Sequence, residues 1–265
     1  MLPFSSILRL SAVAGLLGLD STGALQVMVS RPLVVGGMFG CMLGDTATGL
    51  AVGSLVEMFC IDGVPVGSLV PPDGTMAATM ATAVAIVLAH ASSSVAGPSA
   101  AAAMGILAAV PAGVLGARAE VIQRVLTNRL SRQADADLDA GRLPSMGRIL
   151  ATALGLAWLR GTLVCALGLG VGLPILGWIL AHLPPEGIRA LHWCFWLYWL
   201  LGLAVAANHF WDRRGLKYAA GGALVLAIFG TEFASSQFEI LGLAVVCALM
   251  AGCWRWMGSR RGESA

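Results

Sequence analysis

The stretch LGDTATGLAVGSLVEMFCIDGVPVGSLVPPDG, from Leu43 to Gly74, combines a lipid-compatible composition with features that lipid disfavours. It is mostly apolar, yet it contains three prolines and four carboxylates: Asp45, Glu57, Asp62 and Asp73. Proline breaks helices, and non-helical backbone at membrane depth is tolerated only where it is buried in protein or lines a water-filled cavity. The stretch therefore predicts broken helices around a polar cavity.

The composition of the whole chain also indicates a membrane environment. The 265 residues are 58% hydrophobic and 11% charged, with a mean hydropathy of +0.84. A soluble domain carries about 25% charged residues, so this chain lacks the surface that water requires. We expect an all-α polytopic membrane protein that forms a single membrane domain over residues 1–265 and has no nucleic-acid partner.

The apolar runs divide into two length classes. A spanning helix needs roughly 20 apolar residues. Runs of this kind predict spans at 2–19, 75–117 (two passes with a break near 90–98), 149–181, 190–207, 218–231 and 238–257. The runs 32–44 and 46–60 are too short to span comfortably. Such short, glycine- and proline-interrupted segments are typical of discontinuous or re-entrant transporter helices.

Arginine-rich segments predict the orientation of the carboxyl-terminal half. Residues 118–148 contain six arginines against four acids, and 208–217 and the tail are also basic. Because cytoplasmic loops carry an excess of Lys and Arg, we expect all three segments to face the cytoplasm. The chain then divides into a broken-helix, pocket-forming part (1–117), a cytoplasmic basic loop (118–148) and carboxyl-terminal helices (149–265). The side of the amino terminus stays open.

The basic loop itself has helical character. Its apolar residues recur about one turn apart, and Gly141 with Pro144 predicts the end of the helix. Two interpretations follow, an amphipathic helix lying at the lipid headgroups or a docking surface for a soluble partner.

The four acids of the opening stretch are candidate binding residues. Asp45 lies between two short apolar segments, where it caps the second segment or contributes to the site. Glu57 lies in an apolar helical context, and its two interpretations are a buried structural acid and an acceptor for sugar hydroxyls. Asp73 is either a binding residue or the N-cap of the following helix, and Asp62 is expected at the rim. The same acids are equally suited to Na⁺ or protons.

Arg160 is a further charge within an apolar run. It lies about 12 residues beyond Arg148, or roughly 18 Å along a helix, too deep for easy extension to the loop side. We expect it to pair with an acid, Glu57 or Asp45 before others, or to contact the substrate. The cysteines (Cys41, Cys60, Cys165, Cys194, Cys247 and Cys253) show no metal-binding spacing and are expected to be small buried apolar residues.

Two segments resemble a known family. SRPLVVGGMFGCMLGDTATGLAVGSLVEMF (30–59) and GSLVPPDGTMAA (67–78) are similar to the IIC membrane subunit of the mannose/fructose/sorbose family of the bacterial sugar phosphotransferase system. The matching positions are Arg31, Pro32, Gly44, Asp45, Thr48, Gly49, Gly53, Glu57, Met58, Gly67, Pro72 and Asp73. Arg160 also matches an intramembrane arginine of the family.

The resemblance implies a sugar permease in the bacterial inner membrane. Such a subunit works with a IID membrane subunit, in an oligomer of IIC–IID pairs, while soluble IIA and IIB proteins carry the phosphoryl group on histidines. It implies that this chain is no enzyme on its own and needs no cofactor or metal; its four histidines are scattered. Pro65 stands where many relatives have Asn, so the sugar stays undetermined.

Two rival functions remain from the residues alone. One is an ion- or proton-coupled secondary transporter with Glu57 and Arg160 as the coupling pair. The other is a membrane scaffold that transports nothing.

Overall fold

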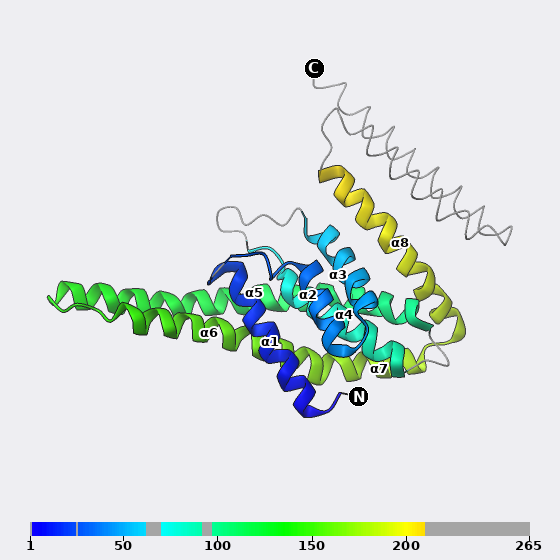
Figure 1. Ribbon diagram of the computed structural model, residues 1–265, viewed down its shortest axis with the longest axis horizontal. Helices are drawn as coiled ribbons and strands as arrows, with labels where there is room; N and C mark the ends of the chain where they lie inside the picture. The colour runs from blue at the N-terminus through cyan, green and yellow to red at the C-terminus, as the bar shows by residue number, and fades with distance from the viewer. Residues whose placement is uncertain (1, 25, 62–69, 92–96, 210–265) are drawn as a thin grey trace, which may run out of the picture. The chain divides into compact units, whose positions relative to one another are not determined.

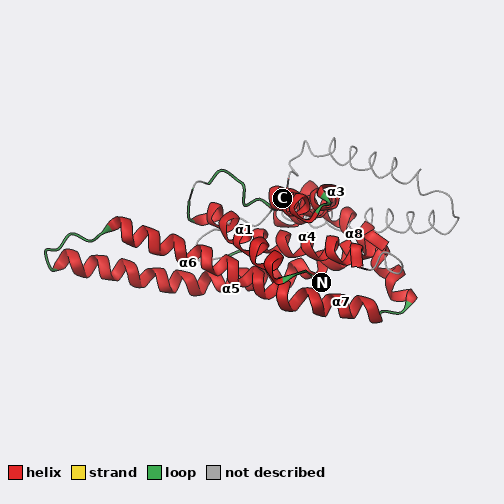
Figure 2. Ribbon diagram, turned by 60° about the horizontal axis from the view of Figure 1, so that its bottom comes forward, coloured by secondary structure: helices red, strands yellow, loops and turns green. Residues whose placement is uncertain are grey.

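The computed structural model describes residues 2–24, 26–61, 70–91 and 97–209. Across these residues the only regular elements are helices (Figure 2). In chain order they are α1 (Phe4–Thr22), α2 (Pro32–Leu43), α3 (Thr46–Cys60), α4 (Gly74–Ala91), α5 (Gly97–Asp139), α6 (Met146–Leu167), the π-helical segment η1 (Gly168–Gly172), α7 (Leu173–His182) and α8 (Pro185–His209). The spans predicted at 218–231 and 238–257 lie outside the described residues, as does Asp62.

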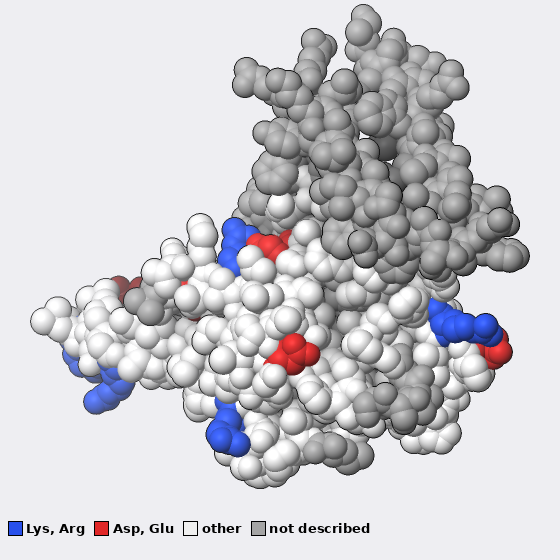
Figure 3. All heavy atoms as spheres, turned by 45° about the vertical axis from the view of Figure 1, so that its right-hand side comes forward, with Lys and Arg blue, Asp and Glu red and all other residues white. Residues whose placement is uncertain are grey.

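The helices meet the requirements of a membrane protein. Within the described ranges, five helical stretches are long and apolar enough to cross a bilayer: α1, α4, α5, α6 through α7, and α8. Figure 3 shows a face on which charged side chains are few. The protein is therefore an all-α polytopic membrane protein, as its composition predicts.

Helix α4 forms the centre of this arrangement. Most of its side chains are buried, and it packs against α2, α3 and α5. Helix α5 also contacts α6 and α8, and α1 packs along α6 (Figure 1). The apolar core therefore consists largely of alanine and other small residues on α4 and α5, which let the two helices approach closely.

The two short segments form an antiparallel hairpin of helices. Their bounds agree with prediction, and at 12 and 15 residues they are roughly 18 and 22 Å long, less than the ~30 Å of hydrocarbon. Glycines form the contact between them. A methyl group on Gly36 would lie 2.5 Å from the Gly49 carbonyl oxygen and 2.7 Å from the Gly53 Cα. The backbones therefore touch, as in other glycine-spaced membrane helix pairs.

The predicted pass at 149–181 is confirmed as one continuous helical stretch. Helices α6 and α7 are joined by η1 without a turn, so the interruption is a change of helix type. A methyl group on Gly168, at the start of η1, would lie 2.5 Å from the Met80 sulfur. Glycine there allows α4 to pack closely.

The basic segment 118–148 differs from a simple loop. Helix α5 continues through the predicted boundary at 117/118 and ends at Asp139, before Gly141 with φ +68°. Its 43 residues are about 65 Å long, twice the hydrocarbon thickness. Helix α6 returns beside it (Figures 1 and 2). A helix this long extends out of the hydrocarbon at one end, and no separate helix begins at residue 118. Its cytoplasmic location stays a prediction.

The expectation that the cysteines are buried was wrong for most of those described. Cys165 is buried, Cys60 and Cys194 are partly exposed, and Cys41 is exposed. Lipid accepts an apolar thiol as readily as a protein core does, so burial is not required.

Candidate functional site

The hairpin brings Glu57 to the amino-terminal end of α2. One carboxylate oxygen of Glu57 lies 3.1 Å from an Arg31 guanidinium nitrogen, and the other accepts the Leu33 backbone N–H at 3.3 Å. The residues are 26 positions apart, so only the antiparallel packing of α2 and α3 makes this contact. A carboxylate at a helix amino terminus satisfies free N–H groups and interacts favourably with the helix dipole. Glu57 is thus ion-paired and about one-quarter exposed.

Asp73 caps the amino terminus of α4. Its carboxylate accepts the Met76 backbone N–H at 3.1 Å, and its own N–H donates to the Gly113 carbonyl of α5 at 2.9 Å. A methyl group on Gly116 would lie 2.6 Å from the Asp73 Cβ, so a glycine is needed there. The capping interpretation of Asp73 is confirmed. Its second carboxylate oxygen faces Arg160 of α6.

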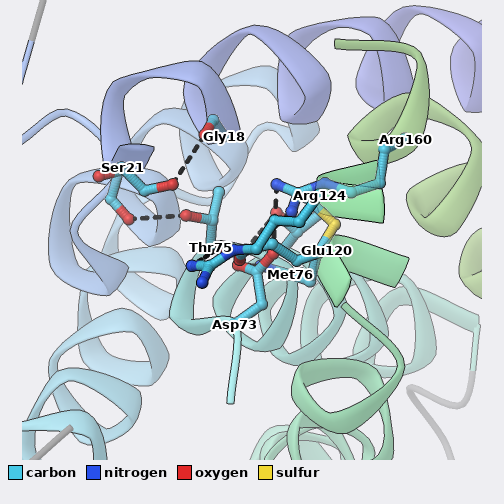
Figure 4. A network of polar contacts seen from close by, with 10 residues as sticks. Gly18, Ser21, Asp73, Thr75, Met76, Glu120, Arg124 and Arg160 are labelled. Atoms are coloured by element: carbon cyan, nitrogen blue, oxygen red, sulfur yellow. Dashed lines mark hydrogen bonds and ion pairs between the residues drawn. The ribbon is translucent and has the colours of Figure 1, made fainter. Parts of the chain in front are cut away.

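Arg160 lies between two carboxylates at this same place (Figure 4). Its guanidinium is 4.0 Å from Asp73 and 3.3 Å from Glu120, and all three side chains are close to nine-tenths buried. Two guanidinium nitrogens of Arg124 donate hydrogen bonds to the other carboxylate oxygen of Glu120, at 2.6 and 3.1 Å. The four side chains form an alternating chain of charges, Asp73–Arg160–Glu120–Arg124, which joins the start of α4 to α5 and α6.

The expected partner of Arg160 was wrong. The sequence favoured Glu57 or Asp45, but the ion pairs of Arg160 are with Asp73 and Glu120. The reason is topological, because α6 packs against α5, which carries Glu120, and against α4, which Asp73 caps. Sequence reasoning missed Glu120, which it placed in the basic loop. The available signal was the spacing of Glu120 and Arg124, four residues apart in a helical segment.

Glu57 and Asp73 lie where the start of α2, the end of α3 and the start of α4 meet. A methyl group on Gly74, next to Asp73, would lie 3.2 Å from Pro32 and 3.6 Å from the Cys60 sulfur. The amino terminus of α4 therefore meets the start of α2 and the end of α3. The two carboxylates bracket residues 62–69, which hold Asp62 and lie outside the described residues.

Asp45 is not part of this group. It lies at the other end of the hairpin, between α2 and α3, and its carboxylate accepts the Thr48 backbone N–H at 3.0 Å. Hydrogen bonds from the Thr48 hydroxyl and backbone hold the pKa of Asp45 below its ordinary value, and His90 at the far end of α4 adds a smaller effect of the same sign. The capping interpretation of Asp45 is confirmed.

The chemistry available at the polar end is recognition by charged and polar groups. The described residues contain no group of three or more His, Cys, Asp or Glu placed to hold a metal ion. The guanidinium of Arg160 supplies hydrogen-bond donors, and the oxygens of Asp73 and Glu57 supply acceptors. A ligand with several hydroxyl groups uses both, because each hydroxyl donates and accepts.

Comparison with known proteins identifies the family. The family model described as "PTS system sorbose-specific iic component" matches residues 4–253. The mannose-specific EIIC component of Escherichia coli K12 is 26% identical over 223 residues, which are 83% of this chain and 77% of that protein. The sorbose-specific EIIC component of Klebsiella pneumoniae is 24% identical over 85% of this chain and 80% of its own. The N-acetylgalactosamine permease IIC component 1 of E. coli K12 is 36% identical over 29% of each.

Solved structures share the fold. A chain described as "Structure of membrane protein" has a TM-score of 0.63 at 22% identity, covering 97% of both chains. A chain from the cryo-EM structure of the mannose transporter ManYZ with microcin E492 has a TM-score of 0.52 at 22% identity, covering 95% of this chain and 94% of its own. The family model covers most of the sequence, and the fold agrees with it. The chain therefore belongs to the family of sorbose-specific IIC components of the sugar phosphotransferase system.

Proposed function

We propose that this protein is the sugar-translocating IIC subunit of a mannose-family phosphotransferase system. Membership of the IIC family supports a sugar permease role, and relatives are named for mannose, sorbose and N-acetylgalactosamine. The partner IIB protein phosphorylates the sugar as it enters, so the chain is no enzyme on its own. It resides in the bacterial inner membrane as a multi-pass protein.

The observation that carries the proposal is the placement of Glu57 and Asp73 at the amino termini of α2 and α4, with Arg160 beside Asp73. Both carboxylates stand at helix amino termini, next to the segment 62–69, and Arg160 adds a buried donor. The oxygens and N–H groups not used in these contacts bind sugar hydroxyls, with Asp62 at the rim. Asp45, at the opposite end of the hairpin, acts only as a helix cap in this proposal.

The partner is a IID membrane subunit. Helix α8 supports this, because its apolar side chains Trp193, Leu197 and Leu201 are about half exposed. In a membrane protein such a surface contacts lipid or another membrane subunit. A chain of the solved mannose transporter ManYZ also shares the fold of this chain. We propose an oligomer of IIC–IID pairs served by cytoplasmic IIA and IIB.

The rival secondary transporter used Glu57 and Arg160 as a coupling pair. In the structure Glu57 pairs with Arg31, while Arg160 pairs with Asp73 and Glu120. Glu57 and Arg160 therefore do not pair with each other here. The secondary-transporter hypothesis was based on that pair, so the structure gives it no support.

The test compares two preparations of the chain. In vesicles with IID, IIB, IIA and a phosphoenolpyruvate-driven phosphoryl supply, labelled mannose, sorbose or N-acetylgalactosamine should accumulate as its phosphate. The chain alone in liposomes should not concentrate sugar under an ion gradient. Accumulation of free sugar by the single chain, driven by the gradient, would refute the proposal in favour of a secondary transporter.

A further inference from the structure

Asp20 is a buried acid that the proposed function does not yet use. It lies in the last turn of α1, and the residue is only 5% exposed. One carboxylate oxygen accepts the Val27 backbone N–H at 2.6 Å, and the other accepts the Ser30 backbone N–H and hydroxyl, both at 3.1 Å. Since both carboxylate oxygens are acceptors, Asp20 holds the connection between α1 and α2 at two points.

The connection needs such an anchor. Gln26 and Met28 have φ of +52° and +67°, in the left-handed region that residues with a Cβ rarely adopt. The side chains of Val27 and Met28 are largely exposed, so their packing contributes little to this backbone conformation. Such a conformation persists only where the surrounding structure enforces it, and the hydrogen bonds to Asp20 supply that constraint.

The connection that Asp20 holds leads directly to the proposed site. The Ser30 carbonyl accepts the Thr75 hydroxyl at 3.0 Å, in the first turn of α4 (Figure 4). Arg31, the next residue along the chain, pairs with Glu57. Ser30 is thus bound to α1 through its N–H and hydroxyl and to α4 through its carbonyl. These bonds fix the backbone from which the Arg31 side chain extends.

A fixed backbone matters for the pair of Arg31 and Glu57. The Arg31 side chain is about half exposed. An exposed ion pair is weak by itself, because ordering a long side chain costs entropy and water screens the charges. The backbone position of Arg31 therefore decides whether its guanidinium stays at Glu57 and holds that carboxylate in one orientation.

Helix α1 is a firm base for Asp20. A methyl group on Gly161 of α6 would lie 2.9 Å from the Gly15 Cα, so the two helices touch at these glycines. The Trp158 indole N–H donates to the Ala12 carbonyl at 3.1 Å. Both contacts lie on the turn of α6 that carries the buried arginine. A residue that positions others must itself be held in place, and α1 meets that condition.

We propose that Asp20 is a positioning residue for sugar binding, which sets the α1–α2 connection so that Arg31 orients the Glu57 carboxylate toward the sugar. The proposal rests on the proposed function and deepens it, since it gives α1 a part in the same site. Asp20 itself does not touch the sugar and acts through Ser30 and Arg31.

The first test uses a matched pair of variants in the complete complex. Asp20→Asn leaves one acceptor oxygen in place of two, so one of its two anchor points is lost. The control Asp45→Asn makes the same change at an acid that also accepts a backbone N–H but lies at the other end of the hairpin. Sugar affinity of the monodisperse complex should fall severalfold for Asp20→Asn and stay unchanged for the control. The fall should be smaller than the roughly 10- to 150-fold expected for losing a bond to a charged acceptor.

A double-mutant cycle separates positioning from a general loss of stability. In an Arg31→Gln background there is no guanidinium to place, so adding Asp20→Asn should lower sugar affinity by less than about twofold further. Equal losses in both backgrounds would overturn the positioning role, and so would an unchanged affinity for Asp20→Asn alone. If that variant does not assemble, Ser30→Ala gives the same comparison, because it removes one of the three hydrogen bonds to Asp20.

A spin label reports on the connection without any sugar. With the label on Met28→Cys in an active cysteine-free background, Asp20→Asn should sharpen the electron paramagnetic resonance spectrum, and Asp45→Asn should not. An unchanged spectrum would show that Asp20 does not hold the connection and would overturn the proposal. If the wild-type complex binds none of mannose, sorbose and N-acetylgalactosamine, the proposed function fails and the role in sugar binding fails with it. The spectrum still decides separately whether Asp20 holds the connection.

Discussion

Replacing Arg160 with methionine tests whether the buried charge chain stabilises the protein. The substitution keeps an unbranched side chain of similar length and removes the charge that Asp73 and Glu120 share. Both carboxylates would remain in place, each close to nine-tenths buried. Glu120 keeps Arg124 as a partner, but Asp73 has no other ion pair among the described residues.

The distances set the magnitude of the expected loss. At an effective dielectric constant of about 20, opposite charges 3.3 Å apart attract by about 5 kcal/mol, and at 4.0 Å by about 4 kcal/mol. Desolvation offsets much of this attraction in the intact protein. Removing one partner of a buried pair nevertheless costs about 3–5 kcal/mol, because the other charge stays buried and uncompensated. For a protein of this size, that corresponds to a fall in Tm of about 6–20 °C.

The assay is thermal unfolding of the detergent-solubilised IIC–IID complex, followed by loss of the monodisperse chromatographic peak. Arg189→Met is the matched control, since Arg189 pairs with Glu186 at a site where both side chains are about three-quarters exposed. Exposed pairs contribute little, so its Tm should stay within 2–3 °C of wild type. Adding Asp73→Asn and Glu120→Gln to Arg160→Met should recover most of the loss. An Arg160→Met Tm equal to that of the control would refute the reasoning.

Four further expectations concern other parts of the molecule. Gly36→Ala should abolish assembly with IID, because its methyl group would lie 2.5 Å from the Gly49 carbonyl oxygen. The control Gly155→Ala has open space around it and should assemble normally. Equal yields of the complex from the two variants would contradict the close helix contact. Glu57→Gln should assemble yet bind sugar about 10- to 150-fold more weakly, as expected for loss of a bond to a charged acceptor; unchanged affinity at normal yield rules out the acceptor role. Asp45→Ala should cost about 0.5–2 kcal/mol of stability through the lost cap and leave sugar affinity unchanged, so weaker binding would return Asp45 to the site. Cysteine at Ala134 should react only with reagents on the cytoplasmic side; labelling from outside would reverse the predicted topology.

Local chemistry alone determined the ends of the short helices. Pro32 occupies the first turn of α2, Gly44 ends it with φ +85°, and Asp45 caps α3. Each effect acts over a few residues, so the bounds 32–44 and 46–60 could be read from the sequence almost as the structure has them. The same holds for the end of α5 near Gly141, and hydropathy sufficed for the all-α membrane class.

The contacts between charges were decided only by the tertiary structure. The sequence predicted that Arg160 needs an acid, because burying a charge without a partner is costly. It could not determine which acid, since each step along a helix turns a side chain by about 100° and the partner depends on which helices pack together. Glycine contacts between α2 and α3 bring Arg31 to Glu57, and the packing of α4, α5 and α6 brings Asp73 and Glu120 to Arg160. Capping is a local interaction and was predictable, whereas ion pairing between helices depends on the three-dimensional packing of the whole bundle.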